Sequence, residues 1–319
     1  MRGVDTAPQM GTALTAMISR VVVALAITSL TAASCMADQY ALVVSGAPGG
    51  QAYATKYEGW RMSLVNALKT SFGYADDHVV TLPTASREQV IHALSDLTMR
   101  LTKSDQLFVA LIGHGSSEGD VAKFNLVGPD MSARDWADQL KPFSGRLIFV
   151  NTTSASFLFL RQLARPGRIV ITATDSTAQE FETVFPEFFI KAFGDPAADR
   201  DKDGRVSIFE AFVYASANVR SWFDRQNRLP TERALLDDDG DGIGREAQNP
   251  EPDGAVAKLT YLQPLNAAAD DPLGRHQVEI ESAIADLKAR RAAMPPAAYD
   301  AELERLLTEL ARVSAQRRR

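Results

Sequence analysis

The chain has 319 residues, of which 45% are hydrophobic and 23% are charged, and its net charge is −6. This composition is typical of a globular protein with a sizeable core, and it excludes a fibrous or disordered chain. Its mild acidity, with basic residues clustered only at 317–319, argues against nucleic acid as a partner.

The N-terminal residues have the pattern of an export signal. Arg20 precedes an apolar run at 21–27, and small residues follow up to Ala37. A positive start, a short apolar centre and a small-residue end predict a signal peptide over residues 1–37 and a periplasmic or extracellular protein. The alternative is a lipoprotein anchored at Cys35, the one case in which we expect contact with a membrane.

Cysteine content limits the chemistry. Cys35 is the only cysteine in the chain, and it lies within the predicted signal. The mature protein therefore has no internal disulfide and no thiolate nucleophile.

Buried strands and amphipathic helices alternate along residues 39–174, a pattern that indicates a parallel sheet covered on both faces. We expect strands at 39–45, 78–82, 107–112, 146–151 and 168–174. The helices expected between them are 56–71, 86–101, 132–140 and 157–163, and residues 116–120 are expected to form a flexible polar loop. A further strand is expected at 258–262.

Two of these strands end abruptly in small polar residues. The strand at 107–112 is followed by His114 between two glycines, and the strand at 146–151 is followed by Thr152, Thr153 and Ser154. The carboxyl ends of parallel strands share one edge of the sheet, where open α/β folds place their sites. A histidine at one strand end and a hydroxyl at the next is the layout of a hydrolase dyad.

These strand ends resemble those of the caspase-hemoglobinase fold and, within it, of the legumain-like (peptidase C13-type) cysteine peptidases. In that family one strand ends in Gly-His-Gly and the next in Ala-Cys-x-Ser-Gly. Residues 113–115 keep the first motif, but the second motif reads Thr-Thr-Ser-Ala-Ser at 152–156, so the family's cysteine falls on Thr153. The resemblance covers residues 38–262 and implies a caspase-like three-layer α/β sandwich with a mostly parallel central sheet.

A calcium loop is predicted after the strand at 168–174. Residues 199–210 read Asp-Arg-Asp-Lys-Asp-Gly-Arg-Val-Ser-Ile-Phe-Glu, with Gly204 at the position where an EF-hand loop turns sharply. The expected oxygen ligands are the side chains of Asp199, Asp201, Asp203, Ser207 and Glu210 and the carbonyl of Arg205. Ca²⁺ prefers six to eight such hard ligands, closed by a bidentate carboxylate. The alternative is an acidic surface turn.

A second acidic loop starts at Asp237. Asp237, Asp239 and Asp241 repeat the spacing of the first three ligands, with Gly242 at the turn, but the twelfth position is Gln248. Without a closing carboxylate we expect weaker calcium binding here, or only a solvated turn.

The C-terminal part is predicted to be helical. Residues 263–275 read as a linker, and 276–319 as an arm of two amphipathic helices separated by Pro295 and Pro296. The apolar stripes of the arm pack on each other, on the first domain or on a partner. The C-terminal helices are thus candidates for mediating association.

Two functions follow from these patterns. The first is an exported calcium-binding pseudo-peptidase, in which the cleft binds a peptide or protein without cleaving it, because the thiol is missing. The alternative is a hydrolase in which His114 is the base, Thr153 or Ser154 is the nucleophile, and the Gly115 N–H helps to stabilise an oxyanion. The sequence leaves the question of enzyme activity open and favours the first function.

Overall fold

The computed structural model describes residues 38–179, 182–263, 272–289, 291 and 294–317. The predicted signal peptide with Cys35, and most of the predicted linker at 263–275, lie outside the described residues.

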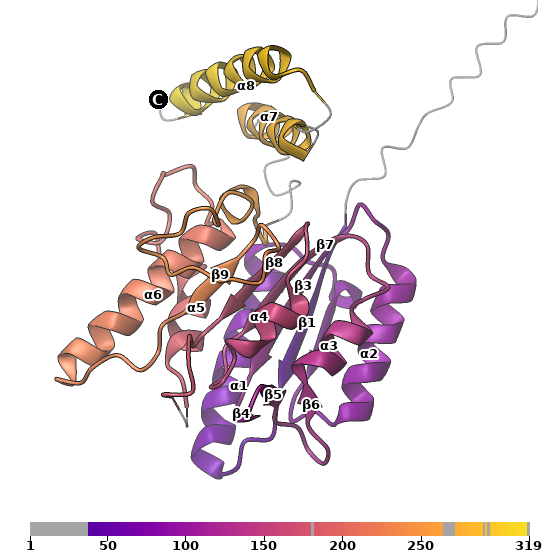
Figure 1. The fold of residues 1–319 in the computed structure, drawn as a ribbon, viewed down its shortest axis with the longest axis vertical. Coiled ribbons are helices and arrows are strands. Elements are labelled where there is room, and N and C mark those ends of the chain that lie inside the picture. The colour runs from indigo at the N-terminus through magenta and orange to yellow at the C-terminus, as the bar shows by residue number, and fades with distance from the viewer. Residues whose placement is uncertain (1–37, 180–181, 264–271, 290, 292–293, 318–319) are drawn as a thin grey trace, which may run out of the picture. The chain divides into compact units, whose positions relative to one another are not determined.

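A six-stranded sheet forms the centre of the fold (Figure 1). Its strands, in spatial order, are β2 (Val79–Leu82), β1 (Gln39–Ser45), β3 (Gln106–Ile112), β7 (Arg146–Asn151), β8 (Arg168–Thr172) and β9 (Leu235–Asp237). The first five run parallel, and β9 pairs antiparallel with β8. The carboxyl ends of β3 and β7 are therefore neighbours, as the sequence predicts.

Helices cover both faces of this sheet. The helices are α1 (Gln51–Asn66), which continues into a π-helical turn (Ala67–Ser71), α2 (Arg87–Arg100), α3 (Ala133–Gln139), α4 (Leu158–Leu163), α5 (Phe185–Ala192) and α6 (Ile208–Arg225). One core contains Val43 and Phe108 and is closed by α1, α5 and α6. The other contains Leu42 and Val109 and is closed by α2, α3 and α4.

These two cores follow from the strand sequences. Successive strand residues point to opposite faces, so continuous apolar strands supply both cores at once. The predicted α/β class, a three-layer sandwich with a mostly parallel sheet, is confirmed.

The region after His114 differs from the prediction. Residues 116–120 were expected to form a flexible loop, but β4 (Gly115–Glu118), β5 (Val121–Phe124) and β6 (Met131–Ser132) form a small antiparallel sheet. Ala122 and Phe124 alternate with exposed or half-exposed residues and are buried, which anchors the hairpin on the second core.

The last predicted strand, at 258–262, is also wrong. A 3₁₀ turn occupies Ala257–Leu259, and Tyr261 makes a single bridge with Ser207. The amides of Lys258 and Leu259 donate to the carbonyls of Gly254 and Val256, both at 3.1 Å. Because these amides bond within the turn, they cannot join a sheet.

The C-terminal helices are α7 (Pro272–Ala289) and α8 (Pro296–Arg317), and they form the predicted helical pair. Their shared core contains Ile280, Ile284, Leu287, Tyr299, Leu306 and Val313. The helix begins at Pro272, before the predicted end of the linker, because proline is tolerated in the first turn of a helix. Among the described helices, none is both long and apolar enough to span a membrane.

Candidate functional site

The first candidate site lies where β3 and β7 end. The His114 side chain follows Gly113, whose φ of 152° a side chain would rarely adopt. The His114 ring is half-buried, with Nε2 at 3.1 Å from both the Tyr57 hydroxyl and the Pro48 carbonyl oxygen. It lies edge-on to Tyr53, with ring centroids 4.7 Å apart. His114 is thus held by α1 and by the loop before it.

The predicted nucleophiles are buried and bonded to other groups. Thr153 is 0% exposed and its hydroxyl donates to the Asn151 side-chain oxygen at 2.8 Å. Ser154 is 2% exposed and its hydroxyl donates to the Gly115 carbonyl at 2.8 Å. Within the described part of the chain, neither hydroxyl is a hydrogen-bond partner of His114. The structure brings the three residues to one sheet edge without joining them as base and nucleophile.

Gly115 closes this strand end. Its amide donates to the Ser154 hydroxyl oxygen at 3.3 Å, so the predicted oxyanion donor is already bonded inside the protein. A Cβ at this position would lie 2.1 Å from the Ser154 carbonyl oxygen. Close backbone packing therefore explains why this position is a glycine.

The Tyr57 hydroxyl beside His114 does not supply a base. Burial raises the pKa of Tyr57, and the nearby Glu182 and Tyr53 raise it further. The phenol is therefore held in its neutral form, which donates or accepts hydrogen bonds but carries no charge.

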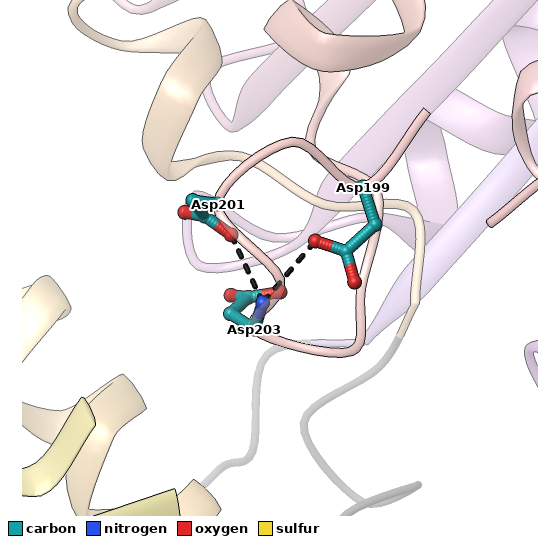
Figure 2. Close-up of side chains that lie close together, drawn as sticks. All are labelled: Asp199, Asp201 and Asp203. Atoms are coloured by element: carbon teal, nitrogen blue, oxygen red, sulfur yellow. Dashed lines mark hydrogen bonds between the residues drawn. The ribbon is translucent and has the colours of Figure 1, made fainter. Parts of the chain in front are cut away.

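The second candidate site is the loop between α5 and α6. Asp199, Asp201 and Asp203 each offer a carboxylate oxygen, and these oxygens lie within 4.8 Å of one another (Figure 2). The Asp203 amide donates to Asp199 Oδ1 at 3.1 Å and to Asp201 Oδ1 at 3.0 Å. Gly204 has a φ of 89°, the left-handed turn that the sequence predicts for this position.

The closing residue of this loop also reaches its beginning. Glu210 Oε1 accepts from the amides of Arg200 and Asp201 at 2.8 and 3.3 Å. Its other oxygen, Oε2, accepts from the amide and hydroxyl of Ser207, which form the capping box of α6. The Ser207 hydroxyl thus caps the helix in this conformation.

The Arg205 side chain lies beside the loop. It stacks on the Tyr261 ring at 3.8 Å and pairs with Asp203 at 3.2 Å and with Glu281 of α7 at 3.3 Å. Arg205 therefore neutralises part of the loop's charge with its side chain, while its predicted metal ligand is its carbonyl.

Charge is crowded in this loop. Burial raises the pKa of Asp201 to about 6, and repulsion from Asp203, Glu210 and Asp199 adds to the shift. A cation placed among these carboxylates would relieve that repulsion, and hard oxygen donors of this kind fit calcium.

The second acidic loop has the same local arrangement. Asp237, the last residue of β9, together with Asp239 and Asp241, offers carboxylate oxygens within 4.8 Å of one another. Gly240 is required here, because a Cβ would lie 2.5 Å from the Arg165 backbone. The residue at the twelfth position of this loop is Gln248.

Two further aspartates, Asp238 within this loop and Asp253 beyond it, were not identified from the sequence as functional residues. Asp253, which is 3% exposed, accepts at Oδ1 from the amides of Asp238 and Asp239 at 2.9 and 3.2 Å. Asp238, also 3% exposed, accepts from three amides of residues 254–257. Burial raises the pKa of Asp253 to about 6, with Asp239 and Asp237 adding to the shift. The only sequence signal for Asp253 was its position in a loop rich in proline and glycine.

Solved structures show similarity in fold. The chain is similar to a Geobacter sulfurreducens protein at 15% identity, over 63% of this chain and 92% of that one, with a TM-score of 0.42. It is similar to caspase-1 of Spodoptera frugiperda at 11% identity, over 64% and 87%, with a TM-score of 0.45. It is also similar to the Drosophila initiator caspase Dronc at 15% identity, over 68% and 85%, with a TM-score of 0.42.

The α/β class with a mostly parallel central sheet rests on the sheet topology itself. No protein-family model and no curated protein sequence matches the chain. At these identities and TM-scores, the activity of the similar proteins does not transfer to this chain.

Proposed function

We propose that this protein is an exported, calcium-binding pseudo-peptidase of the caspase/legumain type, which binds a peptide or protein partner without cleaving it. The observation that carries this proposal is the pairing at the strand ends. His114 bonds to Tyr57 and Pro48, while the Thr153 and Ser154 hydroxyls donate to acceptors inside the protein. In this arrangement His114 is not hydrogen-bonded to either hydroxyl, so it is not positioned as a general base for them.

Calcium binding is supported by the first acidic loop. Three aspartates converge there, and Glu210 bonds back to the start of the loop from the position that closes an EF-hand. The ion would stabilise the loop that connects α5 and α6, and these two helices pack in the same core.

Partner binding is supported by the aromatic residues around His114. The rings of Tyr53, Tyr57 and Trp60 form a stacked series on α1, and Tyr53 and Trp60 are half-buried. Partly exposed aromatic rings are common in binding surfaces, because they bury much area at a small entropic cost. Export is supported by the sequence pattern of residues 1–37 alone.

The test of the proposal is hydrolysis of a broad fluorogenic peptide library by the purified protein in calcium, with an active cysteine peptidase as the positive control. We expect no turnover by the wild type. Turnover that is lost in His114→Ala and in either Thr153→Ala or Ser154→Ala would instead establish the nucleophile-swapped hydrolase.

The calcium part is tested separately, by melting temperature with calcium and with chelator. We expect chelator to lower the Tm of the wild type and to have a smaller effect on Glu210→Gln. Equal melting temperatures of the wild type under both conditions would contradict calcium binding.

A further inference from the structure

The two acidic loops share three hydrogen bonds at corresponding positions. In each loop the sixth amide donates to the first aspartate: Gly204 to Asp199 at 2.9 Å, and Gly242 to Asp237 at 2.6 Å. The fifth amide donates to the third residue, at 3.0 Å in one loop and 2.9 Å in the other. The seventh amide donates to the fifth residue, at 2.8 and 2.6 Å.

The carboxylate that binds the start of each loop comes from a different place. In the first loop, Glu210 accepts from the amides of the second and third positions. In the second loop, the amides of the same two positions, Asp238 and Asp239, donate to Asp253. Asp253 thus occupies the place of the closing carboxylate, although it lies five residues beyond Gln248 in the sequence.

The second carboxylate oxygen of Asp253 provides independent evidence for a bound ion. Asp253 is 3% exposed, and its Oδ2 is buried without a hydrogen-bond partner among the described residues. A buried carboxylate oxygen left unpaired is costly, unless a cation or another donor meets it. In the first loop, by contrast, the second oxygen of Glu210 is bonded to Ser207.

The position of Asp253 is fixed by its neighbour Asp238. The Asp238 carboxylate accepts from the amides of Gly254, Val256 and Ala257 at 2.7–2.9 Å, while its own amide donates to Asp253. This reciprocal bonding holds the segment after Asp253 against the loop. The unpaired oxygen is therefore held in place by the fold before any ion arrives.

We propose that Asp253 completes a second calcium site with Asp237, Asp239 and Asp241. The four carboxylates are hard oxygen donors, which calcium prefers, and none of the four is a nitrogen or sulfur ligand that would favour zinc. The inference deepens the calcium-binding part of the proposed function, and it stands on residues that the first loop does not share. It also replaces the sequence-based expectation that this loop lacks a closing carboxylate.

The test is calcium titration of the full chain by calorimetry and native mass spectrometry. Asp253→Asn is the decisive variant, because its amide oxygen can still accept from Asp238 and Asp239, while an NH₂ group replaces the free oxygen. Glu210→Gln reports on the first loop. Glu251→Gln, which removes an exposed carboxylate two residues away, is the matched control.

We expect two calcium ions in the wild type and in Glu251→Gln. In Asp253→Asn we expect one of the two ions to be lost or to bind at least about tenfold more weakly, with the other unchanged. Glu210→Gln is expected to weaken the other ion. If Asp253→Asn loses an ion while Glu210→Gln binds calcium like the wild type, the result would support the second site. It would contradict calcium binding by the first loop. Unchanged binding in Asp253→Asn would overturn the proposal, whether the wild type takes up one ion or two.

Circular dichroism and the melting temperature in chelator show whether Asp253→Asn folds. Asp239→Asn provides a second variant, because Asp239 is exposed and its side chain does not hold the segment at 253–257. We expect it to weaken the same ion as Asp253→Asn. A folded Asp239→Asn variant that keeps both affinities would also count against the site.

Discussion

At the scale of single residues, the strand ends show how local hydrogen bonds fix the side chains of a candidate site. Thr153, which follows β7, is fully buried, with its hydroxyl bonded to Asn151. His114 is bonded to Tyr57 and Pro48. We therefore expect a thiol at position 153 to be buried and out of contact with His114.

The burial of Thr153 predicts the behaviour of Thr153→Cys, made in a Cys35→Ser background so that one thiol remains. We expect no peptide hydrolysis, and labelling of the native protein by a thiol reagent at least about tenfold slower than in denaturant, because the side chain becomes accessible only by local opening. Thr55→Cys, on the exposed side of α1, is the matched control and should label rapidly. Rapid labelling or turnover in Thr153→Cys would show that the strand end is open.

Glu232 gives a residue-scale prediction about pH. It is 3% exposed and accepts from the amides of Val184 and Phe185 at the start of α5. Burial raises the pKa of Glu232 to about 7, against the lowering effect of those amides. The folded protein therefore binds a proton that the unfolded chain releases near pH ~4.3. The contribution of Glu232 to stability is fully present below that pH and is lost as pH rises through about 7.

The measurement is urea unfolding of the wild type and Glu232→Gln between pH 4 and 8. Relative to the variant, the wild type should lose stability across this range, by an amount on the order of 3 kcal/mol. A constant difference between the two proteins at every pH would contradict the shifted pKa. Glu187→Gln, which removes an exposed carboxylate from α5, is the control.

At the scale of elements, helix starts are encoded locally. Ser86 caps α2, and Gln89 completes a capping box, as the sequence predicts for the cap. Ser86→Ala should lower the free energy of unfolding by about 1 kcal/mol, because it leaves the Gln89 amide without its partner. Ser95→Ala, on the exposed face of the same helix, should be neutral or slightly stabilising. Equal effects of the two substitutions in chemical denaturation would exclude the cap.

Elements that depend on distant partners could not be found in this way. The strand β9 is only Leu235–Asp237, and it is defined by pairing with β8, more than 60 residues earlier. The β4–β6 sheet likewise contains strands of two to four residues, too short for a periodic signal. Long apolar strands and capped helices were predictable, because their signals lie within the elements themselves.

The same distinction applies to the acidic loops. The spacing of Asp199, Asp201 and Asp203 was visible in the sequence, because these residues belong to one turn. Asp253 was not visible as a partner of Asp238 and Asp239, because only tertiary folding places it at the second loop. The sequence also predicted that His114 and Thr153 lie at one edge of the sheet. It did not predict the hydrogen bonds that each side chain makes with other residues.

At the scale of the whole molecule, the buried hydrophobic residues in the described part of the chain form three cores. Two lie on the faces of the central sheet, and the third is made by α7 and α8 alone. The third core shares no buried residue with the other two, so the described residues up to 263 contain both cores of the central sheet. Arg205, which pairs with Glu281 of α7, also has Asp203 and Tyr261 as partners within that part of the chain.

This division predicts that a chain ending at residue 263 folds without the arm. We expect native-like circular dichroism for its α/β part, a cooperative melt and unchanged calcium binding. A chain that ends at residue 291 is the matched control, because it keeps α7 but removes the residues of α8 that cover Ile280, Ile284 and Leu287. The bared stripe should make this longer chain self-associate in size-exclusion chromatography, while the shorter one stays monodisperse. Aggregation of the shorter chain would show instead that the arm covers an apolar face of the domain.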